Sequence, residues 1–219
     1  MKLEILNTSV VVLAKHHNPT ILHPSFLVSE GIVPSEWETA ELPVSTPVFA
    51  MVKYKNGVVF NVEENRFQVT QDTIKDDVGK SQISELACKY VQKLPHVQYQ
   101  ALGVNFKGFV ECAEPQAIVM DHFLKAGVAD FDGTSPEASG LRFVYELPDV
   151  RLRLSFDSGT VKSADNEEKR NGILVDGNYH MALAGRKIHQ EIQKAASLYA
   201  EHYKHFVGVT ESILASEVL

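Results

Sequence analysis

Residues 93–112, in the middle of the chain, limit the possible folds most. They predict one long strand in which the alternation of apolar and polar residues changes phase. Gln98 and Gln100 alternate with apolar neighbours, whereas the apolar residues beyond Ala101 fall on the opposite parity. Successive side chains of a strand point to opposite faces, so a bulge over residues 101–103 would restore one apolar and one polar face. The polar strand face then consists of Gln98, Gln100, Asn105 and Lys107, which we treat as candidate binding residues.

Shorter strands are predicted on both sides of this central strand. Before it, residues 3–14 contain a β-branched run, and three short strands are expected at 48–54, 58–62 and 66–70. Asn56-Gly57 favours a type I′ turn between the first two of these. After the central strand, strands are expected at 141–147 and 150–156. Residues 163–172 are predicted to form a solvated loop, and Asp176-Gly177-Asn178 to turn a hairpin within 173–183.

Helices are predicted where apolar residues recur every three or four positions. Residues 83–94 form such an amphipathic pattern, and shorter helices are expected at 24–30 and 115–125. The last element is a long helix over 186–206, with an extension toward Leu214. The expected fold class is therefore α+β, an antiparallel sheet covered on one face by helices, with a long C-terminal helix.

The two halves of the chain, residues 1–95 and 96–219, show the same order of elements. Each begins with a strand and a short helix, continues with three or more antiparallel strands, and ends with a longer helix. No repeat is visible at the level of residues. We therefore expect a single domain over residues 1–219, with pseudo-duplication of a strand-helix-three-strand-helix unit as a hypothesis for its two halves.

The composition favours a protein of the cytoplasm and disfavours several classes of partner. A chain of 219 residues that is 44% hydrophobic can bury a substantial core. No apolar run approaches the length that crosses a bilayer, so no membrane association is expected. The net charge is −7, and the excess of acid lies in the second half, which argues against nucleic acid as a partner. Cys88 and Cys112 are too few for a disulfide framework.

Residues 130–134 match a signature of phosphatases but stand in the wrong context. Asp130-Phe-Asp132-Gly-Thr134 has the DxDGT pattern of haloacid-dehalogenase-like phosphatases, in which the first Asp attacks phosphorus beside Mg²⁺. In that chemistry the motif follows a buried strand of a parallel sheet. Here it follows a predicted helix and leads into Ser-Pro-Glu, which is typical of an exposed loop.

Other catalytic and metal-binding patterns are weak. His16, His17 and His23 gather near the N-terminus, and His202 and His205 lie one helical turn apart, but no partner at a suitable spacing completes either set. The chain has neither a Gly-x-Ser-x-Gly elbow nor a glycine-rich phosphate loop. We therefore expect no cofactor, no metal site and no catalytic residues, and favour a protein that is not an enzyme.

The C-terminal helix carries an apolar stripe at the spacing of helix-on-helix packing. Two interpretations remain open: the stripe covers the sheet of its own chain, or two subunits share it. The interface candidates on the stripe are Ile188, Ile192, Tyr199, His202 and Phe206.

Three segments together resemble a sporadically distributed family of uncharacterised bacterial proteins of similar length. They are Arg66-Phe-Gln-Val-Thr70, Leu102-Gly-Val-Asn-Phe-Lys-Gly108, and the helix that contains His189-x-x-Ile192 and ends near Phe206 and Thr210. The resemblance implies a bacterial cytoplasmic protein, with a strand pair before the central strand and a C-terminal helix that closes the fold. It implies no catalytic residues, since the family has no assigned activity.

These observations lead to two hypotheses of function. The first is a non-enzymatic module for protein–protein interaction, whose partner is another protein or a second copy of the chain in a homodimer or homo-oligomer. The second is a small-molecule-binding protein, with a pocket between the sheet and the C-terminal helix lined by Tyr199, Tyr203 and Phe206.

Overall fold

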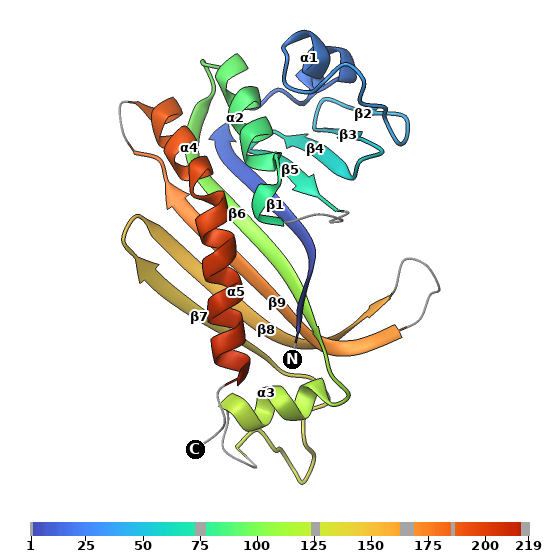
Figure 1. Ribbon diagram of the computed structural model, residues 1–219, viewed down its shortest axis with the longest axis vertical. Coiled ribbons are helices and arrows are strands. Elements are labelled where there is room, and N and C mark those ends of the chain that lie inside the picture. The colour runs from blue at the N-terminus through green and yellow to red at the C-terminus, as the bar shows by residue number, and fades with distance from the viewer. Residues whose placement is uncertain (1, 73–77, 124–127, 163–168, 185–186, 216–219) are drawn as a thin grey trace.

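The structure, a computed structural model, describes residues 2–72, 78–123, 128–162, 169–184 and 187–215. Its described strands form one antiparallel sheet in the order β2-β3-β4-β5-β1-β6-β9-β8-β7 (Figure 1). The strands are β1 (Leu3–Lys15), β2 (Val44–Ser45), β3 (Phe49–Lys53), β4 (Val58–Glu63), β5 (Arg66–Gln71), β6 (Gln98–Glu111), β7 (Gly140–Leu147), β8 (Val150–Lys162) and β9 (Lys169–Ala182). With the helices below, this confirms the α+β class predicted from the sequence.

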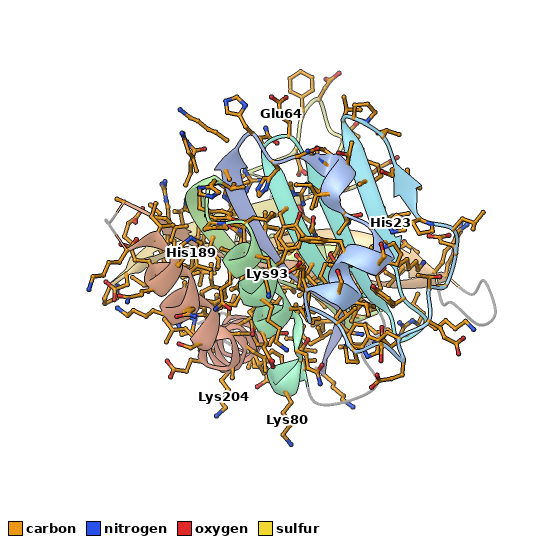
Figure 2. All side chains as sticks on the ribbon, turned by 90° about the horizontal axis from the view of Figure 1, so that it is seen from above. His23, Glu64, Lys80, Lys93, His189 and Lys204 are labelled. Atoms are coloured by element: carbon orange, nitrogen blue, oxygen red, sulfur yellow. The ribbon has the colours of Figure 1, made fainter. Side chains whose placement is uncertain are left out.

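Helices cover one face of this sheet. In Figure 1, α2, α4 and α5 lie in front of the sheet, and Figure 2 shows the same layer edge-on, with Lys80 and Lys204 pointing away from the strands. At one end of the sheet, α3 packs against β8 and β9. The helices are α1 (Pro24–Ser29), α2 (Ile83–Lys93), α3 (Pro115–Phe123), α4 (Ile188–Ser197) and α5 (Tyr199–Ala215), with short 3-10 turns at Pro19–Ile21 and Val78–Lys80.

The strands that open the two halves, β1 and β6, lie side by side at the centre of the sheet. The other strands of the first half lie beyond β1, and those of the second half lie beyond β6. This order is compatible with a duplicated unit, and the duplication itself stays a prediction. The paired central strands place residues from both halves on each face of the sheet.

A bulge near Gln100 resets the alternation of β6. Leu13 of β1 lies opposite Ala101, whereas the next residue, Ala14, lies opposite Tyr99, so Gln100 is the extra residue. The predicted bulge is therefore present, but it lies one residue before the segment 101–103 to which the sequence analysis assigned it. Tyr99 and Val104 are both buried on the side of the helices, and the Tyr99 hydroxyl donates to the carbonyl of Leu94 at the end of α2 over 3.0 Å.

Aromatic side chains fill the space between the sheet and α5. The ring of Phe106 lies 5.5 Å from that of Phe206, centroid to centroid, and also contacts Tyr199 and Tyr203. Phe206 lies against Gly177 of β9, where a Cβ atom would come within 2.5 Å of Cδ2 of the ring. Gly177 thus lets the helix approach the backbone of the sheet.

Two local predictions were wrong, and the long C-terminal helix, which the structure confirms, is not continuous. Residues 176–178 do not turn a hairpin, because β9 runs through them with partners on both sides. In the turn at residues 55–57 only Gly57 has a positive φ, of 84°, whereas a type I′ turn requires two such residues. The last helix is interrupted at Leu198, which separates α4 from α5.

The predicted loop at residues 163–172 is described only in part. Residues 163–168 lie outside the described residues, and Lys169 to Gly172 belong to β9. Among the residues that the structure describes, no helix has the length and apolar character to cross a membrane.

Candidate functional site

The face of the sheet opposite the helices carries a shallow hollow of about 550 Å³. Every residue that lines it belongs to one of four neighbouring strands, β5, β1, β6 and β9. We call this surface the open face. The lining residues are Asn7, Ser9, Val11, Leu13, Arg66, Gln68, Gly103, Asn105, Phe106, Lys107, Asp176, Gly177, Asn178 and His180.

A chain of side-chain hydrogen bonds crosses the floor of the hollow. The Asn178 amide donates to Asn105 Oδ1, and the Asn105 amide donates to Ser9 Oγ over 3.2 Å. The three residues face one another on β9, β6 and β1. Because each amide is held by the next side chain, the polar groups of the floor are fixed before any ligand arrives.

A second chain runs along β5 at the edge of the hollow. The Arg66 guanidinium donates to Gln68 Oε1, and the Gln68 amide donates to Thr70 Oγ1 over 2.9 Å. Arg66 and Gln68 also line a neighbouring hollow of about 310 Å³ over β3 and β4. Polar groups therefore extend across the open face from Asn61 and Glu63 of β4 to Asn178 of β9.

The lack of a side chain at Gly103 keeps this part of the hollow open. Gly103 lies between Val11 and His180 on the neighbouring strands. A Cβ atom at Gly103 would lie 3.3 Å from Nδ2 of Asn178. The absence of a side chain here leaves room beside the amide of Asn178 for a ligand atom.

Charged groups stand around this floor. Lys107 lies directly opposite Asp176, and His180 lies opposite Gly103. Burial raises the pKa of the Asp176 carboxyl; Lys107 counteracts the rise, and Asp157 adds to it. The free-energy cost of burying this carboxylate is therefore only partly offset by its interaction with Lys107. Carboxyl groups whose pKa is shifted in this way are common at binding sites.

Comparison with models of protein families, with curated proteins and with solved structures finds no match. The resemblance to the bacterial family suggested by three segments of the sequence therefore stays a prediction. The candidate site is defined by the geometry of this chain alone.

The structure separates the four residues of the predicted polar strand face. Asn105 and Lys107 line the hollow. Gln98 and Gln100 are exposed near the bulge and are not among its lining residues.

Several residues of the hollow were missed in the sequence. Polar residues alternate in Arg66-x-Gln68-x-Thr70 and in Asp176-x-Asn178-x-His180, which is the signal of a strand with one polar face. The second signal was misread, because Asp-Gly-Asn is also a common turn sequence. Ser9 carries no such signal, since it ends the polar triplet Asn7-Thr8-Ser9, in which polar and apolar residues do not alternate.

The interface candidates on the C-terminal helices lie against the sheet of their own chain. Ile192, Tyr199, His202 and Phe206 are buried, and Ile188 is half-buried. The Tyr199 hydroxyl donates to Thr8 Oγ1 over 3.0 Å, and the His202 ring stacks on Tyr179 at 4.4 Å. In this structure the apolar stripe packs into the core of its own chain, and its role between subunits stays a prediction.

The histidines and the Asp-rich segment are dispersed. His17 is buried near the rings of Phe67 and Tyr99, and His205 shares a hydrogen bond with the Tyr179 hydroxyl. Asp130 and Asp132 stand in an exposed loop that follows α3 rather than a strand. Within the described ranges, no three His, Cys, Asp or Glu side chains converge to hold a metal ion.

Proposed function

We propose that this protein is a non-enzymatic binding protein, and that its open face holds a small polar molecule with a carboxylate or phosphate group. The observation that carries the proposal is the hydrogen-bonded floor of Ser9, Asn105 and Asn178 within the hollow. Its volume of about 550 Å³ suits a small ligand.

The charge of the ligand follows from the groups around the floor. Two cations from different strands, Arg66 of β5 and Lys107 of β6, line the hollow, against one carboxylate, Asp176. The chain as a whole carries a net charge of −7. A cationic rim on an acidic protein favours an anionic group on the ligand, which arginine and lysine hold through charge-assisted hydrogen bonds.

The hydrogen bonding of the Ser9 hydroxyl supports binding rather than catalysis. Ser9 Oγ accepts a hydrogen bond from the amide of Asn105. An activated nucleophile would also donate its proton to a base, and among the described residues no His, Asp or Glu side chain accepts a hydrogen bond from Ser9 Oγ. A pocket under α5, the second hypothesis from the sequence, has less support, because Tyr199, Tyr203 and Phe206 pack around Phe106.

The test is a thermal-shift and calorimetric screen with matched pairs of probes. Adenosine monophosphate is compared with adenosine, glucose 6-phosphate with glucose, and citrate with glycerol. We expect at least one charged probe to raise the Tm, while its neutral counterpart does not, because a ligand of the folded state stabilises it by mass action.

Two substitutions and one matched control locate the site. Lys107→Met and Arg66→Met should each weaken binding of the active probe by about tenfold, whereas Lys53→Met, on β3 outside the hollow, should leave it unchanged. The proposal is wrong if no charged probe binds, or if Lys53→Met weakens binding as much as Lys107→Met.

A further inference from the structure

The two edges of the sheet differ in a way that bears on assembly. One edge strand, β2, has two residues, whereas β7 at the other edge has eight. In Figure 1, β7 lies at the margin of the sheet. In the described part of the chain no strand pairs with its outer side.

The outer side of β7 presents a regular row of backbone groups. The Ser158 amide donates to the carbonyl of Ser139 over 3.1 Å, just before the strand begins. In an antiparallel ladder hydrogen-bonded pairs alternate, so the odd-numbered residues of β7 bond to β8. The amide and carbonyl groups of Arg142, Val144 and Glu146 therefore point outward.

Among the features with which proteins usually prevent strands from pairing, this edge has only two charged side chains, Arg142 and Glu146. Its eight pairs with β8 continue without a bulge, and it contains neither Lys nor Pro. Val144, at its centre, is 47% exposed. The edge is thus open to another strand, and its sequence indicates which strand fits.

The sequence of β7 is complementary to itself. It reads Leu141-Arg-Phe-Val-Tyr-Glu-Leu147, with Val144 at the centre. If a second copy pairs antiparallel about a two-fold axis at Val144, Arg142 of each copy lies opposite Glu146 of the other. Phe143 then lies opposite Tyr145, and Val144 opposite itself, so every pair combines residues on the same face of the sheet.

In the same register, the outward backbone groups of the two copies can form hydrogen bonds with one another. With Val144 opposite itself, the outward amides and carbonyls of Arg142, Val144 and Glu146 meet their counterparts as hydrogen-bonded pairs. A shift by one residue would place helix-side residues opposite open-face residues, which the pleat does not permit. A shift by two would separate Arg142 from Glu146.

We propose that the protein forms a homodimer through β7, in which the sheets of two copies join into one continuous antiparallel sheet. The partner is a second copy because the charges and rings of β7 match those of β7 itself. Within its own chain Glu146 contacts Arg151 at 2.8 Å, so in the dimer it lies between that arginine and Arg142 of the second copy. This interface differs from the C-terminal stripe inferred from the sequence.

The test is sedimentation velocity on the full chain at concentrations up to about 200 µM, with charge-swapped variants. Arg142→Glu places Glu opposite Glu, and Glu146→Arg places Arg opposite Arg. Each variant alone should dimerise about tenfold or more weakly than the wild type. An equimolar mixture of the two should form heterodimers, because each Glu then meets an Arg.

A second pair of variants distinguishes this edge from the other. Val144→Lys brings two ammonium groups together at the two-fold axis and should give monomers, whereas Val44→Lys, the same change on β2, should leave the dimer intact. A monomeric wild type, or a mixture of charge-swapped variants that stays monomeric, overturns the proposal. Dissociation by Val44→Lys but not by Val144→Lys overturns it as well.

Discussion

The ring of Phe206 packs on the backbone of Gly177, where a Cβ atom would lie 2.5 Å from Cδ2 of the ring. This contact joins α5 to β9, the neighbour of the central strand β6. Because the ring leaves no space for a Cβ atom, even one added methyl group at position 177 disturbs the packing.

Gly177→Ala should lower the free energy of unfolding by about 1–3 kcal/mol, because the new methyl group overpacks the core. Urea unfolding followed by circular dichroism measures it. Gly208→Ala is the matched control: nothing lies within 4 Å of a Cβ there, and alanine in a helix should add about 0.5–1 kcal/mol. Equal stability of Gly177→Ala and the wild type would contradict the contact.

Thr8→Val should lower the free energy of unfolding by about 1–2 kcal/mol, because Tyr199 loses the acceptor of a buried hydrogen bond. The Thr8 hydroxyl in turn donates to the carbonyl of Asn105 over 3.0 Å. A double-mutant cycle with Tyr199→Phe checks the pair. Simple additivity of the two changes would show that they do not interact.

Asp176→Asn should stabilise the protein at neutral pH, because burial raises the pKa of this carboxyl. The folded state therefore binds its proton more tightly than the unfolded chain, and stability falls as pH rises from the ordinary carboxyl pKa through the raised one. Unfolding at pH 7 and at pH 3 measures the difference, which should shrink at pH 3. The same substitution should tighten binding of an anionic probe.

Acid should destabilise the protein below about pH 6.5, because burial lowers the pKa of both His17 and His202. Well above that pH, both rings are neutral in the folded and in the unfolded state. Below it the unfolded chain takes up protons that the folded chain does not, and stability is lost as pH falls toward the lowered pKa values.

Replacement of these rings by Phe tests the cause of the acid sensitivity. His202→Phe can retain the stack on Tyr179, and His17→Phe can retain the contacts with Phe67 and Tyr99. The fall in unfolding free energy between pH 7 and pH 5 should be smaller in each variant than in the wild type. A fall of the same size would assign the sensitivity to other groups.

Local patterns predicted the elements well where a single physical signal was present. The strands at 48–54, 58–62 and 66–70 correspond to β3, β4 and β5, since they are rich in β-branched and aromatic residues and are separated by turn residues. Asp176-Gly177-Asn178 carried two signals at once. Its turn propensity is overridden because Gly177 receives Phe206 and Asn178 bonds to Asn105.

The open face could not be assembled from the sequence. Ser9 and Asn105 are 96 residues apart, and their contact depends on β1 lying beside β6. Alternation shows that a strand has a polar side, but it does not show which strands are neighbours. Asn105 and Lys107 were identified because they belong to the central strand itself.

The central position of β1 and β6 also determines the order in which the molecule can fold. Their pairing joins residues such as Thr8 and Asn105, which are 97 positions apart, so a long loop must close before the middle of the sheet forms. Such high contact order favours slow folding. During synthesis β1 can pair with β5 before the second half of the chain has been made. Until β6 pairs with it, the other edge of β1 is unpaired, and a chaperone could bind there.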